Sequence, residues 1–467
     1  MQEAKLNKFD AFMLLVCGIM FADAIASNTS AGVSSVSWWL ILGLLYMIPS
    51  GFIIGELSGR LPGEGGIYVW IYEGMGPKWA ARASWLFFAC GLFIPVSSFV
   101  MFSDILFALL MPEVGLIPRI ALAIVLIWVL AWVSCKPMAD AKWVTNVAGI
   151  IKLSIFALCL LAGIYYIASG YAVGNEIILN TLLPSLDEGL MFLPIIVYCC
   201  TGMELASASA EQMDNPSKML PKVVIGVAIM AVVLNIISSL GMMFVIPIED
   251  IDLDTAILDI FVTAFGSPVW RYIIGFLFLF ALFAQNLTWI VGGNRGTAEG
   301  AKAGDLPAFL GRETEAGQPI GAILTSCTAG TILLIVYAFA AETAADLFFA
   351  LLQCGVIGSL LPYVFMLIAY QRLKARGEMD PDKYDGYRAP AGVALSWVAQ
   401  IIQCVTLFLM IYIPTVGWNP DVITNVAGAV LMVGSGELAI WWASRTKGPG
   451  DGGELEETDA KKLEATL

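Results

Sequence analysis

Long apolar stretches without a single Asp, Glu, Lys or Arg follow one another along most of the chain. Seven of them cover residues 24–55, 153–175, 223–248, 272–294, 318–341, 347–371 and 389–420. Each is at least as long as the roughly 20 residues that an α-helix needs to cross a bilayer. Because the apolar positions are continuous and do not alternate with polar ones, a transmembrane β-barrel is not expected. The pattern predicts an all-α membrane protein.

Hydropathy, punctuated by Pro, Gly and charged residues, predicts twelve transmembrane helices. The expected spans are 10–37 (interrupted), 39–58, 80–111, 117–135, 143–169, 188–212 (interrupted), 220–247, 269–296, 319–341, 344–371, 392–413 and 420–444.

Composition supports the membrane prediction and excludes several kinds of chemistry. The chain has 467 residues, of which 59% are hydrophobic and 13% charged, and its mean hydropathy is +0.83. A soluble domain of this size would need far more polar surface. The sequence contains no histidine, so imidazole metal ligands and His-based catalytic triads are excluded. Its nine cysteines show no CxxC spacing, and we expect no metal, no cofactor and no enzyme activity.

The distribution of basic residues predicts the orientation. If both termini are cytoplasmic, only Arg119 and Arg271 among the 24 basic residues fall outside. The positive-inside rule therefore predicts a multi-pass protein of the inner (plasma) membrane with both termini in the cytoplasm. The net charge of −14 lies largely in the external segment 249–259 and in the C-terminal tail. An acidic outer face would concentrate cationic solutes, although ordinary solvated loop charge is the favoured explanation.

Two spans carry polar and small residues where a plain helix would be apolar. The first holds Asp23, Ser27 and Asn28 in its middle, and the sixth holds Thr201, Gly202 and Glu204. Unwound backbone at membrane depth is tolerated only where a cavity or ligand satisfies its N–H and C=O groups. Paired broken helices in corresponding positions of two halves are typical of a carrier built from inverted repeats.

Several stretches resemble the amino acid–polyamine–organocation superfamily, and in spacing the glutamate/GABA antiporter branch. They are LPGEGGIYVWIYEGMGP from Leu61, TGMELASASAEQMDNPSKMLPK from Thr201, WIVGGNRGTAEGAKAGDLPAFL from Trp289 and YDGYRAP from Tyr384. The resemblance covers about residues 10–445. It implies a leucine-transporter-type fold of two inverted five-helix repeats plus two helices, working by alternating access.

On this fold the expected organisation is a cytoplasmic N-terminus (1–9), a first five-helix repeat (10–175), a second, inverted repeat (188–373), two accessory helices (391–445) and a disordered acidic tail (446–467). The resemblance also implies a substrate site between spans 1, 3, 6, 8 and 10. It places the first hinge at residues 23–27 and the second at residues 200–204. The implied substrate-binding residues are Asp23, Ala26, Ser27, Tyr198, Cys200, Thr201, Gly202, Glu204, Asn286 and Trp289.

Asp23 departs from the pattern of the superfamily. Many members have a G-[ST]-G turn in the first hinge, whose bare amides bind a carboxylate, whereas this chain reads ADAIAS. An Asp there favours a substrate that is cationic at its amine, and the alternative is that Asp23 only caps the broken helix or pairs internally. Glu204 is expected to act as a ligand, gate or proton carrier, or else as a structural hydrogen-bonding group. An aromatic wall of Trp289, Tyr198 and Phe192 would suit a cationic head, although ordinary packing is the default for each ring.

Lys152 lies about two turns into the fifth span. A lone lysine there could extend to the inner interface. The resemblance implies a second interpretation, because sodium-independent members of the superfamily place a lysine amine where sodium-coupled relatives bind sodium. In that case Lys152 would bridge the first and eighth spans as a fixed cation, and transport would not need sodium.

The sequence therefore predicts a secondary active permease or exchanger for an amino acid or small organic amine. The alternatives are a sodium-coupled amino acid symporter and, in a different class, a channel for small solutes. A channel would want a continuous polar stripe or a filter loop, and the sequence has only localised breaks. The expected partners are the substrate and the lipid bilayer, with a counter-substrate or a proton left open and no nucleic acid.

Overall fold

The computed structural model describes residues 5–136, 142–184, 196–253, 255–339, 344–380, 382–383, 385–415 and 420–446. Apart from one β-bridge between Leu6 and Met213, the regular elements of these residues are helical. They are α1 (Lys8–Ile19), η1 (Ala22–Ala24), α2 (Ile25–Ser30), α3 (Ser35–Leu42), η2 (Gly43–Met47), α4 (Ile48–Arg60), α5 (Ile67–Met75), α6 (Pro77–Leu110), α7 (Leu116–Val133), α8 (Lys142–Ala168), α9 (Leu179–Leu182), η3 (Met203–Gln212), α11 (Pro216–Val245), η4 (Ile248–Asp250), α12 (Ala256–Phe265), α13 (Val269–Lys302), η5 (Ala308–Gly311), α14 (Ile320–Ala338), α15 (Ala344–Ala375), α16 (Gly392–Thr415) and α17 (Pro420–Thr446).

Eight helical stretches in this part of the chain are long and apolar enough to cross a membrane. They are Lys8–Ser30, Ser35–Arg60, Pro77–Leu110, Leu116–Val133, Lys142–Ala168, Pro216–Val245, Val269–Lys302 and Gly392–Leu409. A shorter apolar helix covers Ile320–Val336. The prediction of an all-helical, multi-pass membrane protein is thus confirmed, and the count of twelve spans stays a prediction.

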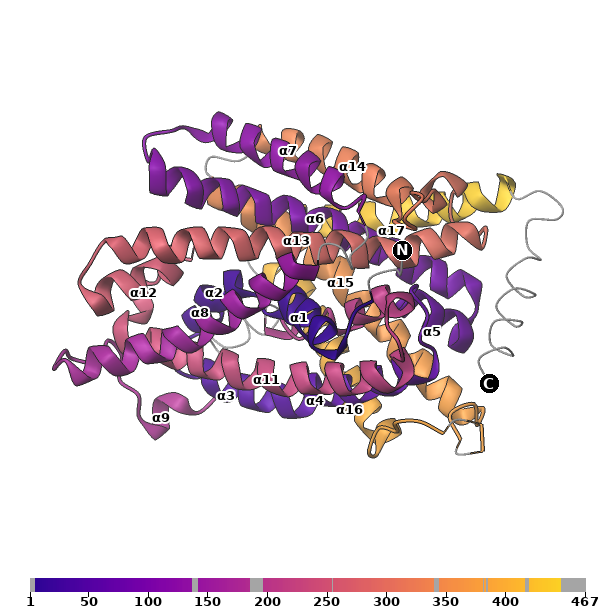
Figure 1. Ribbon diagram of the computed structural model, residues 1–467, viewed down its shortest axis with the longest axis horizontal. Helices are drawn as coiled ribbons and strands as arrows, with labels where there is room; N and C mark the ends of the chain where they lie inside the picture. Colours follow the sequence, from indigo (N-terminus) through magenta and orange to yellow (C-terminus); the bar gives the residue numbers. More distant parts are fainter. Residues whose placement is uncertain are drawn as a thin grey trace.

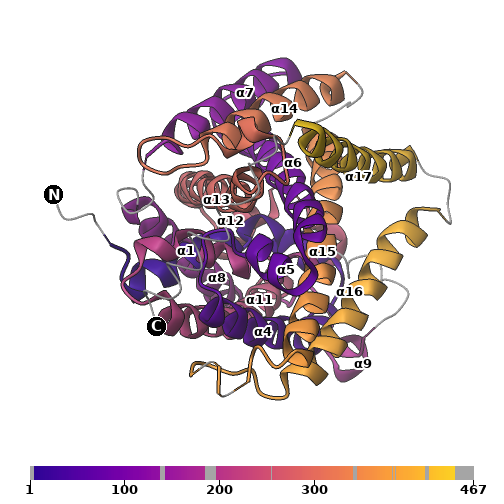
Figure 2. The same cartoon turned by 90° about the vertical axis from the view of Figure 1, so that its right-hand side faces the viewer.

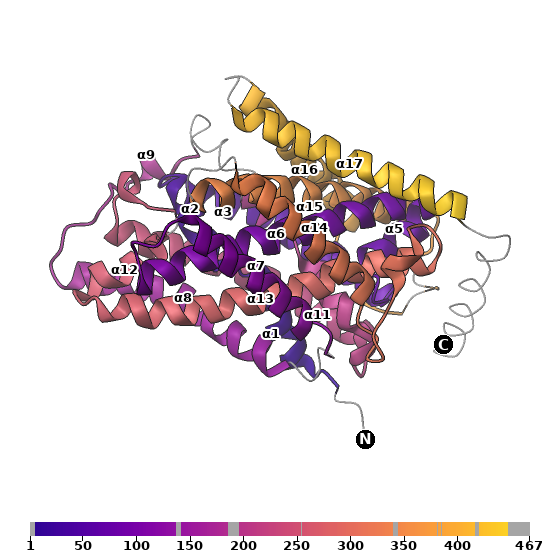
Figure 3. The same cartoon turned by 90° about the horizontal axis from the view of Figure 1, so that it is seen from above.

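The long helices form one bundle in which they run roughly side by side (Figure 1). Helix α6 packs against both α13 and α15, and α11 packs against α8 and α4. In the most apolar segment of α6, 94% of the residues are buried inside the bundle, compared with 22% in that of α7. Helix α6 is therefore central, whereas α7 pairs with α14 at one edge of the bundle (Figure 2). Helix α17 lies along another edge, beside α16 and α15 (Figure 3).

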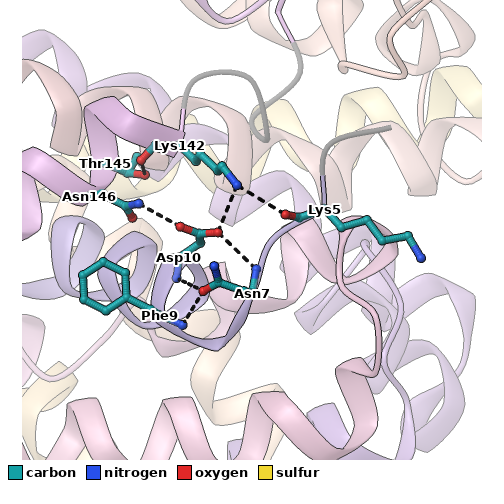
Figure 4. A network of polar contacts seen from close by, with 7 residues as sticks. All are labelled: Lys5, Asn7, Phe9, Asp10, Lys142, Thr145 and Asn146. Atoms are coloured by element: carbon teal, nitrogen blue, oxygen red, sulfur yellow. Dashed lines mark hydrogen bonds and ion pairs between the residues drawn. The ribbon is translucent and has the colours of Figure 1, made fainter. Parts of the chain in front are cut away.

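Helix α1 lies inside the bundle, in contact with α8, α11, α13 and η3. It begins with a capping box, in which the side chain of Asn7 accepts from the backbone N–H of Asp10 at 3.0 Å and Asp10 accepts from that of Asn7 at 3.1 Å. The same carboxylate also reaches α8, because Asn146 Nδ2 donates to it at 2.8 Å and Lys142 Nζ at 3.2 Å (Figure 4). This network fastens the start of the first span to the start of α8.

The residues before α1 are attached to the end of η3. Leu6 donates its backbone N–H to the carbonyl oxygen of Gln212 at 2.8 Å and forms the β-bridge with Met213. The neighbouring Lys5 pairs with Asp214 at 3.0 Å, but both side chains are largely exposed, so this ion pair adds little stability. The segment that leads into the first interrupted span is therefore joined to the segment that leaves the second one.

Candidate functional site

The first span is interrupted, as the sequence pattern predicted, but the break begins a few residues earlier than the predicted hinge. Helix α1 ends at Ile19, Met20 and Phe21 have non-helical backbone angles, and a short turn at Ala22–Ala24 leads into α2. The break therefore covers residues 20–24, and we call it the first break. The predicted hinge at 23–27 was placed too far along the chain: Asp23 lies in the break, whereas Ala26 and Ser27 lie in α2. Asp23 is half-buried, and Ala26 and Ser27 are buried.

Side chains from neighbouring helices satisfy the carbonyl groups in the last turn of α1. Trp289 of α13 donates its indole N–H to the carbonyl oxygen of Gly18 at 2.8 Å. Lys152 of α8 donates its ammonium to the carbonyl oxygen of Cys17 at 2.6 Å. A helix that ends at membrane depth leaves such carbonyls without backbone partners and carries a partial negative charge there. A cation and an indole N–H are suitable partners, so α13 and α8 stabilise the broken conformation.

The second break lies at residues 199–202, between the end of a helical turn at Tyr198 and the start of η3. Gly202 has φ of +94°, a backbone conformation that favours glycine. A Cβ atom at this position would lie 2.9 Å from Ile19 Cγ2 and 3.0 Å from Trp289 Cζ2. Gly202 therefore lets the second break approach the first closely, and a larger residue would push the two apart.

Tyr363 of α15 bridges the last residue of the second break and the first turn of η3. Its hydroxyl accepts from the backbone N–H of Gly202 at 2.6 Å and donates a short hydrogen bond to Oε2 of Glu204. Glu204 is buried in the first turn of η3, and its Oε1 has no hydrogen-bond partner among the described residues. One carboxylate oxygen of Glu204 is therefore held in place, and the other is available to a donor that arrives from outside the protein.

A chain of polar side chains joins α8, α13 and the first break. Lys152 Nζ donates a short hydrogen bond to Oε1 of Gln285, and Gln285 Nε2 lies 3.4 Å from each carboxylate oxygen of Asp23. Lys152 and Gln285 are buried, with 1% exposure each. Lys152 thus contacts α1 and α13 within the bundle and does not extend to an interface. The carboxylate of Asp23 is held by long, weak contacts with an amide.

Aromatic rings surround the two breaks. The ring centroid of Phe21 lies 5.0 Å from that of Tyr198 and 6.0 Å from that of Trp289, and Phe87 also stacks on Trp289 with centroids 6.1 Å apart. The hydroxyl of Tyr198 has no partner in the described part of the chain. Two predicted aromatic residues, Tyr198 and Trp289, therefore come together at the breaks, and the third, Phe192, lies outside the described residues. Phe21 and Phe87 were not predicted from the sequence.

The remaining predicted residues make local contacts. Cys200 and Thr201 bond to backbone carbonyl oxygens of the preceding turn. Asn286 donates to Ser98 Oγ of α6 at 2.9 Å and to the carbonyl oxygen of Leu282, so its amide is engaged toward α6. Its neighbour Gln285 is the residue of α13 that reaches Asp23. Gln285 and Tyr363 are the two polar site residues that the sequence did not single out.

A small cavity lies beside η3, the helix that follows the second break. Its volume of about 10 Å³ is enough for about one water molecule. Its lining includes Glu204 and Ala208 of η3 and Glu64 in the connection between α4 and α5. A larger cavity of about 250 Å³, lined in part by Asp250, Asp252 and Asp259, lies near α12. The elements η4 and α12, which carry Asp250 and Asp259, contact α2, the helix after the first break.

Within the described ranges, no group of three or more His, Cys, Asp or Glu side chains could hold a metal ion. The polar groups at the breaks are carboxylate, amide, ammonium and hydroxyl groups, which suit recognition of a small charged solute.

Comparison with known proteins agrees with this geometry. A family model described as amino acid permease matches residues 6–435. The chain is 26% identical over 449 residues to the probable agmatine/putrescine antiporter AguD of Lactococcus lactis subsp. lactis (strain IL1403), covering 94% of this chain and 95% of that protein. It is 23% identical over 411 residues to a probable polyamine transporter of Arabidopsis thaliana, covering 86% of this chain and 79% of that protein. The solved structure of a manganese transporter from Eremococcus coleocola superposes with a TM-score of 0.56 at 10% identity, over 93% of each chain, a likeness of fold alone.

The bundle with its broken first span is thus that of a multi-pass membrane transport protein, and not of an enzyme. The chain belongs to the amino acid permease family, within the amino acid–polyamine–organocation superfamily that its sequence motifs resemble.

Proposed function

We propose that the protein is a secondary active exchanger for a small organic amine, with the cationic head bound between the first and second breaks. The observation that carries the proposal is the pair of carboxylates at these breaks. Among the described residues, the side-chain hydrogen bonds of Asp23 are long contacts with Gln285, and one buried oxygen of Glu204 has no partner. Two carboxylates with unused acceptor capacity favour a cation over the carboxylate end of an amino acid.

The aromatic surroundings support the same class of substrate. The rings of Phe21, Tyr198 and Trp289 lie next to the break that carries Asp23. A cation over an aromatic face gains roughly 0.5–2 kcal/mol. Relatives with similar sequence are named as agmatine/putrescine and polyamine transporters, and the acidic cavity near α12 would concentrate cations on its side of the membrane. We assign substrate contact to Asp23, Glu204, Tyr198, Gly202 and Trp289, with Ala26, Ser27, Cys200 and Thr201 as backbone or packing contributors.

The finer fold belongs to this proposal as well. We assign twelve transmembrane helices in two inverted five-helix repeats, 10–175 and 188–373, followed by two accessory helices, 391–445. The likeness to a solved transporter and the paired breaks support the arrangement. With the N-terminus 1–9 and the tail 446–467 both cytoplasmic in the inner (plasma) membrane, the end of the bundle that carries Asp10, Lys142 and the connection 61–66 faces the cytoplasm.

Lys152 supports exchange without sodium. Its ammonium group already neutralises the carbonyl end of α1 and contacts α13, so a second cation at the same place would be repelled. A sodium-coupled amino acid symporter is the alternative, and it would require that Lys152 move away. Proton coupling through Glu204 is compatible with either mode.

Counterflow in proteoliposomes tests the proposal. Vesicles loaded with unlabelled putrescine should accumulate labelled putrescine or agmatine with saturation, and a zwitterionic amino acid lacking a second amine should compete poorly. Asp23→Asn should abolish this exchange while the protein remains folded. The exposed Asp250→Asn, on the acidic cavity, is the matched control and should retain exchange. Unchanged exchange in Asp23→Asn, or flux that does not saturate, would contradict a carrier with this site.

A further inference from the structure

Glu64 is a largely buried carboxylate that lines the same cavity as Glu204. It lies in the connection between α4 and α5, its side chain is 9% exposed, and it pairs with Arg295 of α13 at 2.6 Å. A buried ion pair is expensive to desolvate and stabilises a fold only weakly compared with apolar residues of similar size. Because Glu64 also lines the same cavity as Glu204, a role beyond stability is considered for this ion pair.

The small cavity beside η3 lies between Glu64 and Glu204. Both residues line it, and the rest of its lining includes glycines from the connection and from α13: Gly65, Gly66, Gly292, Gly293 and Gly296. A Cβ atom built on Gly293 would meet nothing closer than 3.7 Å. The two carboxylates therefore share the lining of one small cavity to which the connection and α13 contribute several glycines.

Arg295 has a second partner to which it can turn. The same Nη1 that contacts Glu64 donates to the carbonyl oxygen of Gly317 at 2.6 Å and lies 3.8 Å from Glu313. Arg295 itself has 5% of its side chain exposed. Release of Glu64 would thus leave Arg295 beside another carboxylate, so that the usual penalty for a buried unpaired charge is avoided.

The surrounding charges leave room for one more cation. Arg295 lies beside both Glu64 and Glu313. Glu313 also pairs with Lys302 at 2.7 Å, and Lys302 pairs with Glu299 at 2.8 Å. This chain of ion pairs, which we call the inner charge network, contains three carboxylates and two cations. A monovalent cation at Glu64 would bring it to neutrality, with Arg295 shifting toward Glu313.

We propose that Glu64 is a second binding site for the amine, on the cytoplasmic side of Glu204, where an ammonium or guanidinium group replaces Arg295 as the partner of the carboxylate. The inference rests on the proposed function and adds a residue to it. An amine that leaves Glu204 toward the cytoplasm meets Glu64 next, and an amine that enters from the cytoplasm is captured there first. The internal pair with Arg295 closes the same route when no amine is present.

Sided transport separates this role from a structural one. Putrescine uptake would be measured in inside-out and right-side-out membrane vesicles that contain the full chain. Glu64→Gln should raise the half-saturating concentration about tenfold from the cytoplasmic face, as expected for loss of one charged partner. From the external face the value should stay within about twofold. Glu64→Asp, which keeps the charge, should recover most of the cytoplasmic affinity.

Two further variants keep the test decisive. Glu73→Gln in the adjacent helix α5 removes an exposed carboxylate that does not line the cavity. It should leave the half-saturating concentration unchanged at both faces. Glu313→Gln removes the second partner of Arg295 and should also weaken cytoplasmic entry, even if Glu64→Gln folds poorly. Equal effects on both faces, no effect on either, or a leak with unchanged half-saturation would overturn the inference and leave a purely sealing role for Glu64. If exchange depends on Asp23 while Glu64→Gln is silent, only this inference fails; if wild-type vesicles move no amine, the proposed function fails with it.

Discussion

Lys152 of α8 donates a hydrogen bond to the side-chain oxygen of Gln285 in α13, while the amide nitrogen of Gln285 faces Asp23 in the first break. The lysine also holds the carbonyl oxygen of Cys17 at the end of α1. One buried cation thus fixes the end of a broken helix and, through an amide, the orientation of the carboxylate that we assign to the substrate. The neutral amide of Gln285, at 3.4 Å from the carboxylate of Asp23, supports the proposal that Asp23 binds an external cation.

Lys152→Met should reduce exchange at least about tenfold, because it leaves Gln285 and the carbonyl oxygen of Cys17 without their buried donor. Wild-type exchange should be unchanged when sodium is replaced by potassium on both sides. Lys142→Met in the same helix, where the lysine is partly exposed and pairs with Asp10, is the control and should have a smaller effect. Initial rates in proteoliposomes check both expectations, and a strict sodium requirement would contradict the role given to Lys152.

Gly202→Ala should lower the melting temperature and the transport rate together. The substitution forces an alanine to φ of +94° and places its Cβ within 3.0 Å of Ile19 and Trp289. Gly170→Ala separates the two causes, since Gly170 has φ of +87° but nothing within 4 Å of its added Cβ. In both variants the strained backbone conformation should lower the free energy of unfolding by about 1 kcal/mol. Only in Gly202→Ala should the close contacts of the added Cβ lower it further. Thermal unfolding in detergent provides the measurement; equal losses would show that the two breaks are not in tight contact.

Tyr363→Phe should weaken amine exchange by about tenfold. Without the hydroxyl, the backbone N–H of Gly202 and the second oxygen of Glu204 both lose their partner in a buried site. Tyr370→Phe in the same helix is matched to it, because the hydroxyl of Tyr370 also bonds a buried glutamate, Glu56, at 2.6 Å. That variant should cost stability without changing the half-saturating amine concentration. The same kinetic change in both variants would indicate a general effect on α15.

Cytoplasmic amine affinity should depend on pH near neutrality. Burial raises the pKa of Glu64 to about 7; Arg295 opposes the rise, and Glu211, Glu299 and Glu313 add to it. The carboxyl group therefore gains a proton as the pH falls below this value and stops attracting a cation. From about pH 8 to about pH 6 the ionised fraction falls about tenfold, and the half-saturating concentration at the cytoplasmic face should rise accordingly. The half-saturating concentration at the external face should not show this pH dependence, and Glu64→Gln should remove it at the cytoplasmic face. A pH dependence that persists in Glu64→Gln would show that another group causes it.

The class of protein and the presence of broken helices could be predicted because both follow from composition at membrane depth. Polar residues such as Asp23 and Glu204 are costly inside a bilayer, so their occurrence in apolar spans predicted the breaks. The exact position of the first break could not be predicted. It depends on donors from other helices, Trp289 and Lys152, that hold the carbonyl oxygens of Gly18 and Cys17.

Gln285 and Tyr363 were missed for different physical reasons. Adjacent helical residues point in directions about 100° apart, and sequence alone cannot tell which of Gln285 and Asn286 faces the first break without the rotation of α13. Tyr363 lies in a long apolar run of α15, where a tyrosine is usually a packing residue. Only the approach of α15 to Gly202 reveals the hydroxyl as a bridge to Glu204.

We propose that the carboxylate of Asp23 in the first break holds the cationic head of the substrate. Equilibrium binding of putrescine to purified protein, measured by calorimetry for wild type and Asp23→Asn, tests it without requiring transport. We expect saturable binding to wild type and at least about tenfold weaker binding to Asp23→Asn, since a charged hydrogen-bonded contact is lost. Equal affinity of the two proteins for putrescine would contradict it.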